Sequence, residues 1–470
     1  MAENREFFVT AIVVSHDGAT WLAETVAAIS AQHRLPNQII AVDNGSTDLS
    51  VRLLKNAGIP VIEQDRQKGF GAAVAAAVNA TPKISSDTSN VTSNQGTVQN
   101  KSKPEEWLWI LHDDSAPRRE ALENLLTAVA DRPQVAIAGP KILGWHDRKH
   151  VLEAGVSIAE NGTRWTGMEV REHDQGQHDD VKEVLAVSTA GMLIKRDVFE
   201  QLGGFDPSLE LFRDDVDLGW RAHVAGYSVI RVGSAAVYHA EAATNERRSI
   251  DVKDALLHRP LLLDRRNAAF VMLANSSWWL LPWIFLQLIT AAIGRSIVYL
   301  LAKLPGYAGD EIAAVGLLLF KPQDLINSRR QRRSQKLLSP RIIKPFIPKR
   351  GILIRATIVR SINAITKPFR IPEYLQERIK PRDYADIGVM DESFDEIEFV
   401  PRARFARLRA LSNRPLLFGL LITFVINLFY ARNRIGNLSG GALPVAPESA
   451  RELFGKFLEP WHIVGLGTSS

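Results

Sequence analysis

The sequence predicts an α/β fold in which a mostly parallel sheet domain is followed by a helical, membrane-associated region. Three observations carry this prediction. The first 80 residues alternate between β-rich runs and helical patterns. The run from Trp107 to Ser115 is an apolar strand that ends in two adjacent carboxylates. Long uncharged stretches, typical of membrane-associated helices, follow in the second half of the chain.

Length and composition limit the class of protein. A chain of 470 residues with 46% hydrophobic content has material for two or more folded units. The absence of cysteine excludes disulfide frameworks, thiolate metal sites and cysteine nucleophiles, and fits a reducing compartment. The N-terminus runs directly into a strand-like segment without the pattern of a signal peptide. We therefore expect the N-terminal half to lie in the cytoplasm.

The first part of the chain predicts repeated βα units. Strands are expected at Phe7–Ser15, Gln38–Asp43 and Val61–Gln64, and helices at Thr20–Gln32, Leu49–Ala57 and Gly71–Asn79. Such units imply a parallel sheet with helices on both faces. Residues 81–104 are rich in Ser, Thr, Asn and Lys, so we interpret them as a flexible insertion within the domain. The strand that begins at Trp107 then resumes the sheet.

The remainder of the globular part is less regular. Arg118–Ala130 predicts a helix and Val135–Leu143 a strand, whereas Gly144–Val181 is polar and predicts a loop-rich excursion. An apolar stretch at Val184–Lys195 precedes a clear turn at Gly203–Pro207. We expect the globular domain to occupy residues 1–270.

Two uncharged segments predict membrane contact. The segment Trp278–Gly294 has 17 residues without a charge, and an apolar run continues after Arg295, so we interpret residues 271–320 as membrane-spanning or re-entrant. Residues 415–431 form a second such segment, which predicts a transmembrane helix at 413–432 and a tail at 433–470. The alternative is that both segments are buried core helices.

A basic region at residues 321–412 separates these segments. Between Lys321 and Arg382 there are 17 lysine and arginine residues and 3 acidic residues. Nucleic acid is one partner for such a region, but apolar segments on both sides favour an anionic membrane and no nucleic acid. The positive-inside rule then puts this region on the cytoplasmic face of the cell membrane.

Two short motifs near the N-terminus suit nucleotide binding. Asp43 ends the second predicted strand, where a carboxylate can accept hydrogen bonds from a base or ribose, although the following Asn-Gly is also an ordinary turn signal. Gly69 lies between a predicted strand and the Ala-rich helix that is expected from Gly71, so backbone N–H groups there can meet a phosphate. Two glycines before a helix are also common for packing reasons.

Acidic motifs predict a metal and a base. His112-Asp113-Asp114 follows the buried strand and suits a divalent cation, with capping of the next helix as the alternative. Asp214, Asp217 and Arg221 recur at helical spacing, with Asp215 on a different side; a solvated helix start would explain the outer acids. His239 ends a later β-like run and offers an imidazole.

Together these motifs resemble the GT-A-fold (Rossmann-like) glycosyltransferases of family 2, which move a sugar from a nucleotide-sugar to an acceptor hydroxyl. The resemblance covers residues 7–245, and its five motifs occur in the family's order: Val13-Val14-Ser15-His16-Asp17-Gly18, Val42 to Asp48, His112 to Asp114, Gly203 to Asp206 with Asp214 to Asp217, and Tyr238-His239. One position departs from the pattern. His112 stands where the family often has the first acid of Asp-X-Asp, so its nucleotide contact passes to Asp113.

The resemblance implies roles for the motif residues. It makes Asp215 the general base and gives Asp114 and His239 to a divalent metal, Mn²⁺ or Mg²⁺, that holds the diphosphate. The nucleotide-sugar contacts fall to Ser15, Asp17, Asp43, Gly69 and Asp113, and the acceptor side to Asp214, Asp217, Trp220 and Arg221.

The chemistry then follows from the two acid sites. A divalent ion neutralises the diphosphate leaving group, and a carboxylate takes the proton of the attacking hydroxyl. We expect an inverting transferase of cell-envelope biogenesis, with a lipid-linked or glycan acceptor at an anionic membrane. The alternatives are a sugar-phosphate nucleotidyltransferase and a non-catalytic membrane scaffold that binds nucleotide-sugars.

Overall fold

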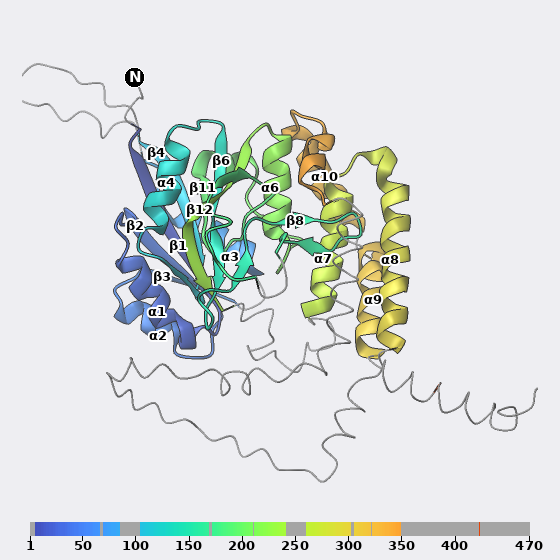
Figure 1. Cartoon of the computed structure of the whole chain (residues 1–470), viewed down its shortest axis with the longest axis horizontal. Helices are drawn as coiled ribbons and strands as arrows, with labels where there is room; N and C mark the ends of the chain where they lie inside the picture. Colours follow the sequence, from blue (N-terminus) through green and yellow to red (C-terminus); the bar gives the residue numbers. More distant parts are fainter. Residues whose placement is uncertain are drawn as a thin grey trace, which may run out of the picture. The chain divides into compact units, whose positions relative to one another are not determined.

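A single large sheet organises the N-terminal part of the protein, which we describe from a computed structural model (Figure 1). The structure describes residues 5–65, 69–84, 104–168, 172–209, 211–240, 260–301, 305–320, 322–348 and 423. The chain divides into two compact units, and the first comprises Met1–Tyr299 with Pro305–Asp391. The sheet and nearly all of the helices around it belong to this first unit.

The sheet has ten strands in the order β10-β12-β6-β11-β4-β1-β2-β3, with β5 on β12 and β7 on β6. The strands are β1 (Phe7–Ser15), β2 (Gln38–Asn44), β3 (Val61–Gln64), β4 (Glu105–His112), β5 (Ser115–Pro117), β6 (Val135–Gly144), β7 (Val151–Glu153), β10 (Val181–Glu183), β11 (Met192–Lys195) and β12 (Ser228–His239). A separate hairpin pairs β8 (Ser157–Ile158) with β9 (Arg164–Trp165).

Strand direction decides where the functional residues meet. The pairs β1 with β2, β1 with β4, β2 with β3 and β6 with β12 are parallel. The strand β11 is antiparallel to both of its neighbours, β4 and β6, so these two run in the same direction. The carboxyl ends of β1, β2, β4 and β12 therefore lie at one edge of the sheet, where open α/β sheets bind their ligands.

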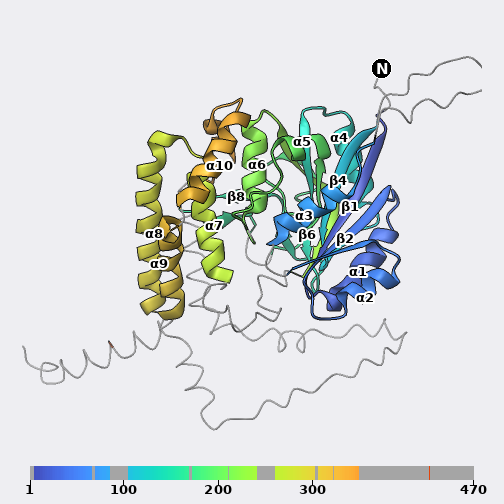
Figure 2. The same cartoon turned by 180° about the vertical axis from the view of Figure 1, so that it is seen from behind.

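Alternate residues of the central strands fill two hydrophobic cores, one on each face of the sheet. On one face Ile12 and Ile110 pack with α3 (Gly69–Ala80), α5 (Arg196–Gln201) and α6 (Asp214–Val224). On the other face, residues such as Trp109 pack with α1 (Ala19–Ser30), α2 (Ser50–Asn56) and α4 (Ala121–Ala130). Figure 2 shows the sheet from behind.

A third core joins later helices to this domain. It unites Trp220 of α6 and the β8–β9 hairpin with α7 (Pro260–Asn275), α8 (Leu281–Leu301) and α9 (Pro305–Phe320). The short helix η3 (Trp278–Leu280) precedes α8, and α10 (Pro322–Gln335) and η4 (Pro340–Phe346) follow α9. The expected domain boundary at residue 270 falls inside α7, where the residues on both sides of it are buried.

Most expected elements of the sheet domain are confirmed to within a few residues. Three further features were not part of the expectations. The strand β11 is antiparallel, a direction that apolar composition cannot predict. The apolar stretch Val184–Lys195 forms a strand only over its last four residues, and residues 185–191 before it form a buried loop. The polar excursion Gly144–Val181 contains the short strands β7 to β9.

Several expectations concern residues outside the described ranges. These are the transmembrane helix at 413–432 apart from residue 423, the tail at 433–470, most of the insertion at 81–104 and the part of the basic region beyond residue 348. Within the described residues, one helical segment is both long enough and apolar enough to cross a membrane, and it comprises Trp278–Leu301.

Candidate active site and metal centre

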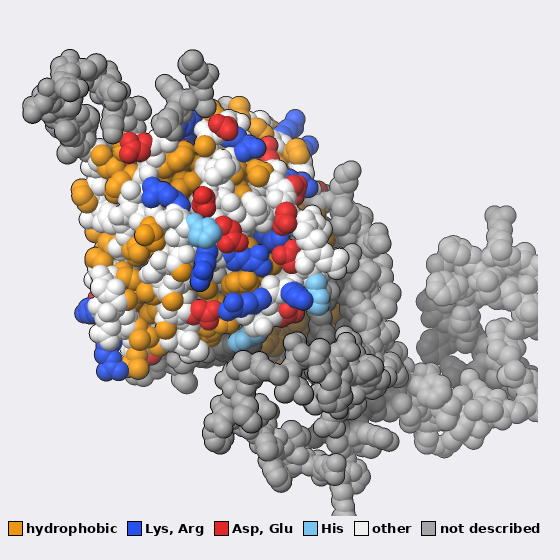
Figure 3. Space-filling model, turned by 60° about the vertical axis from the view of Figure 1, so that its left-hand side comes forward, with side chains coloured by type: hydrophobic (Ala, Val, Ile, Leu, Met, Phe, Trp, Pro, Cys, Tyr) orange, Lys and Arg blue, Asp and Glu red, His pale blue; other side chains and the backbone are white. Residues whose placement is uncertain are grey.

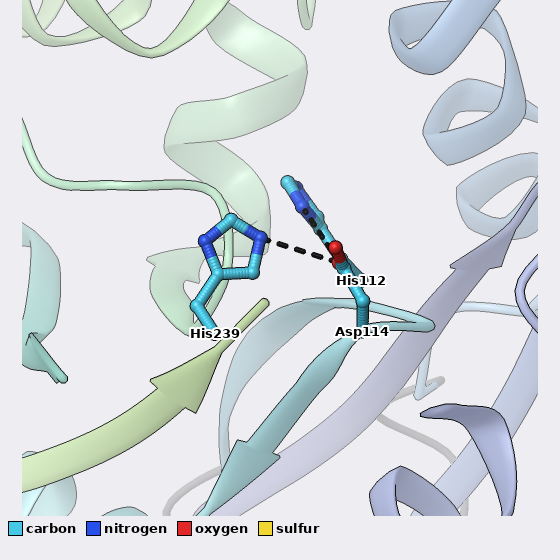
Figure 4. A group of neighbouring side chains, drawn as sticks. All are labelled: His112, Asp114 and His239. Atoms are coloured by element: carbon cyan, nitrogen blue, oxygen red, sulfur yellow. Dashed lines mark ion pairs between the residues drawn. The ribbon is translucent and has the colours of Figure 1, made fainter. Parts of the chain in front are cut away.

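Three side chains from different strand ends gather at the carboxyl edge of the sheet (Figure 4). His112 ends β4, Asp114 follows it, and His239 ends β12. His239 Nε2 lies 3.2 Å from Asp114 Oδ1, and His112 Nδ1 lies 3.9 Å from the same oxygen. All three candidate ligand atoms lie within 4.8 Å of one another, so one divalent cation can contact them together. We call these three side chains the metal group. Carboxylate oxygen and imidazole nitrogen are both common ligands of divalent metal ions.

The imidazole of His112 is held from its other side. Its Nε2 lies 2.9 Å from Thr189 Oγ1, and its ring contacts that of Phe70 edge-on with centroids 5.0 Å apart. A partner on one ring nitrogen fixes the direction of the other, as is common for metal-binding histidines. Thr189 thus leaves Nδ1 directed toward Asp114. His112, which stands where the family often has an acid, is therefore one of the three candidate metal ligands.

Asp113 points away from this group and into the turn after β1. Its Oδ2 accepts hydrogen bonds from Ser15 Oγ at 3.2 Å and from the backbone N–H of His16 at 2.7 Å. The side chain is buried, and a Cβ on Gly18 would lie only 2.0 Å from the same oxygen. Adjacent residues after a strand diverge in this way, so Asp113 holds the β1–α1 turn while Asp114 joins the metal group.

The turn carrying Asp17 is tied to the turn after β2. Asp17 has a left-handed backbone with φ 48°, and its Oδ1 accepts hydrogen bonds from the backbone N–H of Thr47 at 2.7 Å and from Thr47 Oγ1 at 3.2 Å. Its own N–H donates to Ser46 Oγ at 2.9 Å. These bonds keep the ends of β1 and β2 together at the site edge.

Asp43 has a carboxylate oxygen beside this turn that accepts no hydrogen bond from the described residues. Only 2% of Asp43 is exposed, and its Oδ2 accepts a hydrogen bond from the Ser46 N–H at 2.9 Å. Its Oδ1 is buried without a hydrogen-bond partner among the described residues. A buried carboxylate oxygen without a donor is costly, and a ligand N–H or O–H would satisfy it. Gly69, with φ 76°, begins the nearby helix α3.

The acidic start of α6 contains the expected base. Asp215 is 4% exposed, and its Oδ2 lies 2.8 Å from Nη1 of Arg164 on β9. Arg164 also donates to Glu153 Oε1 from Nη2 at 2.9 Å. Burial alone would lower the pKa of Arg164, but the carboxylates of Asp215 and Glu153 raise it, so the guanidinium stays charged. Burial and the charge of Asp215 raise the pKa of neighbouring Asp214 to about 7.

Helix α7 fixes the turn before α6. Phe212 and Arg213 have positive φ values of 66° and 68°, a conformation that costs free energy in residues other than glycine. Asp264 accepts hydrogen bonds from Arg213 Nε at 2.7 Å and from Nη2 at 3.0 Å. Asn267 Nδ2 donates to the carbonyl of Leu211 at 2.5 Å. These contacts hold the backbone that positions Asp214 and Asp215.

Asp217 and Arg221 lie inside a buried ion network. Asp217 is fully buried; its Oδ2 accepts from Arg221 Nε at 2.7 Å, and its Oδ1 accepts from Arg332 Nη2 at 2.7 Å and from Asn275 Nδ2 at 2.8 Å. Arg332 also donates to Asp206 at 2.8 Å. Burial alone would raise the pKa of Asp217, but the two guanidinium groups lower it to about 2. The network joins α6 to α7 and α10, and Trp220 packs in the hydrophobic core beside it.

Ring contacts connect the metal group to the turn that precedes α6. Phe70 lies between His112 and Phe205, with its ring centroid 5.7 Å from that of Phe205. Close packing at this point requires a residue without a side chain, since a Cβ on Gly71 would lie 2.8 Å from Phe205 Cβ. The turn of the Gly203–Asp206 motif is therefore packed against the site.

A comparison with known families decides the identity. Residues 6–252, more than half of the chain, match the family described as "Glycosyltransferase like family 2". The chain belongs to glycosyltransferase family 2. The expected enzyme class is thereby confirmed, together with the GT-A class of its mostly parallel sheet domain.

Bacterial transferases are among the relatives of this glycosyltransferase. An N-acetylglucosaminyl-diphospho-decaprenol L-rhamnosyltransferase of Mycobacterium tuberculosis is 22% identical over 287 residues, which cover 58% of this chain and 86% of the relative. A galactofuranosyltransferase of Mycolicibacterium smegmatis is 22% identical over 212 residues, which cover 45% of this chain and 63% of the relative.

Solved structures include two similar chains. Residues 1–349 of TarS from S. aureus are 13% identical, with a TM-score of 0.38 and coverage of 72% of this glycosyltransferase and 91% of TarS 1–349. A mannosyltransferase from Pyrobaculum calidifontis, in complex with GDP-Man and Mn²⁺, is 17% identical, with a TM-score of 0.36 and coverage of 71% and 84%.

Sequence reasoning missed several partners of the site residues in this glycosyltransferase. Thr189 lies in an irregular segment and Arg164 in the two-residue strand β9; neither belongs to a motif, so no pattern indicated them. Arg332 belongs to the basic region that we expected at a lipid surface, yet it is 9% exposed and paired with Asp206 and Asp217. Asn267 follows two arginines in a helix that the acidic motifs did not include.

Proposed function

We propose that this glycosyltransferase moves a sugar from a nucleotide-diphosphate sugar to a hydroxyl of a lipid-linked or cell-envelope glycan, with inversion at the anomeric carbon. The observation that carries the proposal is the grouping of His112, Asp114 and His239 at the carboxyl edge of the sheet, where Asp43 also lies, one residue before the end of β2. Such a grouping supplies ligands for a metal–diphosphate complex, and Asp43 supplies a hydrogen-bond acceptor for the nucleoside.

Asp43 is the proposed contact to the nucleoside. Its buried Oδ1 has no donor among the described residues, and an imide N–H of a base or a ribose hydroxyl would satisfy it. Asp17 and Ser15 support this edge indirectly, through Thr47 and Asp113 respectively. The first turn of α3, starting at Gly69, offers backbone N–H groups to a phosphate.

The metal ligands proposed are Asp114 and His239, with His112 as a third. A divalent ion bound there would neutralise the charge that develops on the diphosphate leaving group. The mixed carboxylate and imidazole set favours Mn²⁺ over Mg²⁺, which prefers oxygen ligands. Thr189 and Phe70 orient the His112 ring toward this position.

Asp215 is the proposed general base. The acceptor oxygen forms a bond to the anomeric carbon while the bond from that carbon to the diphosphate oxygen breaks, and the hydroxyl proton passes to the Asp215 carboxylate. Attack opposite the leaving group inverts the anomeric centre. Arg164, 2.8 Å from Asp215, fixes the orientation of the carboxylate. Asp214 is proposed to lie on the acceptor side; Asp217, Trp220 and Arg221 would support that side through their packing.

The acceptor proposal rests on a relative and on surface charge. The related rhamnosyltransferase of Mycobacterium tuberculosis carries a diphospho-decaprenol compound in its name. Exposed basic residues in α10, in η4 and between them suit an anionic membrane: Arg330, Arg333, Lys336, Arg341 and Lys344. We propose that the catalytic domain works at the cytoplasmic face of the cell membrane.

A screen of nucleotide-sugars with and without Mn²⁺ tests this function. The full chain should release nucleoside diphosphate from one donor when metal is present, and a lipid-linked acceptor should accelerate the release. Release of inorganic diphosphate would instead indicate a nucleotidyltransferase. Binding without turnover, for any donor and acceptor tested, would contradict the proposal and favour a scaffold.

A further inference from the structure

We propose that α8 is an interfacial membrane anchor, whose outer face lies on an anionic bilayer without crossing it. This inference does not depend on the sugar that is transferred. The face drawn in Figure 3 mixes acidic, basic and hydrophobic side chains, whereas the surface of α8 and η3 is apolar.

Only one stripe of α8 is covered by the protein. Ile284, Leu288, Ala292 and Ser296, spaced four residues apart, are buried. Large apolar side chains elsewhere on η3 and α8 are exposed: Trp278 (73%), Trp279 (56%), Trp283 (56%), Leu286 (55%), Ile293 (47%), Ile297 (51%) and Val298 (63%). Soluble proteins rarely expose so large a contiguous apolar surface, and such surfaces mark partner or membrane contacts.

Ion pairs along the inner side of α8 argue against a crossing. Arg295 Nε lies 2.8 Å from Oε2 of Glu311 on α9, and Arg265 Nε of α7 lies 2.9 Å from the other oxygen, Oε1. Glu311 is fully buried, and Ser296 Oγ donates to the carbonyl of Ala308 at 2.9 Å. A spanning α8 would bring α7, α9 and these charges into hydrocarbon, at high free-energy cost.

Helix α7 also fastens the hairpin of α8 and α9 to the catalytic domain. Asn275 binds Asp217 of α6, and Asn267 binds the turn before Asp214. In both cartoon views α7 lies between α8 and the central sheet (Figures 1 and 2). Lipid can therefore reach α8 only from its outer side, which favours an interfacial position over a transmembrane one.

Aromatic and basic residues at one end of α8 indicate the kind of membrane. The three tryptophans at positions 278, 279 and 283 suit the boundary between headgroups and hydrocarbon. Helix α10 lies near this end, because Arg329 Nη1 donates to the carbonyl of Ser276 at 3.0 Å. Its exposed Arg330 and Arg333 complement anionic headgroups.

The β8–β9 loop connects α8 to the base that the proposed function assigns. The loop between β8 and β9 rests on the inner side of α8, where a Cβ on Gly162 would lie 3.5 Å from both Ala268 Cβ and Leu288 Cδ2. Two residues later, Arg164 pairs with Asp215. One short loop therefore links the inner side of α8 to the proposed base.

Single cysteines test the inference cleanly, because the chain has none. We would attach an environment-sensitive fluorophore to the full chain carrying Trp283→Cys or Val298→Cys, with Leu49→Cys (52% exposed) as the matched control. Vesicles containing phosphatidylglycerol should shift the emission at positions 283 and 298 to shorter wavelength and leave position 49 unchanged. Phosphatidylcholine vesicles should give a smaller shift. An unchanged spectrum at both α8 positions would overturn the proposal, and would indicate that another part of the chain or a second copy covers this face.

Labelling from one side distinguishes an anchor from a span. Ser277→Cys places a thiol just before η3 and α8, and Gly306→Cys places one in the first turn of α9, shortly after α8 ends. When protein is bound to the outside of vesicles, a membrane-impermeant maleimide should modify both thiols as it does Leu35→Cys on the catalytic domain. Protection of position 306, relieved by detergent, with position 277 still labelled would show a crossing helix and refute the interfacial arrangement. Neither outcome depends on sugar transfer, so failure here leaves the proposed function intact.

Discussion

Arg164 Nη1 lies 2.8 Å from Asp215 Oδ2, and this contact joins the polar excursion over the sheet to the acidic start of α6. The same guanidinium binds Glu153 of β7. The positive charge of Arg164 thus balances carboxylates from two separate segments of the chain. The pair has two consequences, one for the position of the base and one for stability.

Arg164→Gln should slow turnover about 10- to 100-fold with little change in donor affinity, because Asp215 loses the group that orients it. The variant should also lose about 3 kcal/mol of unfolding free energy, since buried carboxylates remain without their cation. Arg164→Lys, which keeps the charge, should recover part of both. Steady-state kinetics and denaturant unfolding check this, and equal rates for wild type and the Gln variant would contradict it.

Asp215→Asn should lower kcat about 10²- to 10⁴-fold and leave donor binding unchanged, because the amide cannot take the acceptor proton. Asp197→Asn is the matched control, since Asp197 is an exposed acid in the first turn of another helix, α5. Turnover and calorimetric titration of the nucleotide-sugar measure the two effects. A variant that keeps full turnover would remove Asp215 from the role of base.

Thr189→Val should weaken Mn²⁺ binding about 10-fold, because the His112 ring loses the hydroxyl that orients it. Thr127→Val is the control, since Thr127 Oγ1 donates to the Glu123 carbonyl within its own helix. Electron paramagnetic resonance of free Mn²⁺ gives both affinities. Asp114→Asn should abolish the site, and equal affinities for all three variants would place the metal elsewhere.

Asp214→Asn should become more stable relative to wild type as the pH rises from 5 to 8. Burial, with the neighbouring Asp215, raises the pKa of Asp214 from 3.8 to about 7. Because the folded pKa is the higher one, the protonated acid contributes stability below pH 4, and that contribution is lost as the pH rises toward 7. Over the whole range between the two pKa values, the unfolding free energy of the variant relative to wild type changes by at most about 4 kcal/mol. Urea unfolding at both pH values measures it, and a constant difference would contradict the shift.

Asp217→Asn should show the opposite pH dependence. Although burial alone would raise the pKa of Asp217, Arg221 and Arg332 lower it from 3.8 to about 2. The ionised acid therefore contributes stability above pH 4, and the contribution is lost as the pH falls toward 2. The variant should be destabilised by about 3 kcal/mol at pH 7, and the difference should narrow at pH 3. Unfolding curves at both pH values test the sign.

Local pattern was enough to predict the order of the sheet domain. A strand such as Phe7–Ser15 has an apolar run bounded by turn residues, and these signals lie within a few positions of one another. The antiparallel direction of β11 has no such signal, because it depends on which strands flank it. The same limit applies to α7, whose role follows from contacts with a turn more than 50 residues earlier.

The sequence by itself determined the family resemblance and the acids at the strand ends, since the carboxyl ends of parallel strands must share one edge. Only the tertiary structure decided which acid faces which partner. Asp113 turns toward Ser15 while Asp114 meets His239, although the two are neighbours. Thr189 approaches His112 across 77 residues, and Arg332 approaches Asp217 across 115. Contacts over such separations arise from packing of the whole domain, and no local pattern encodes them.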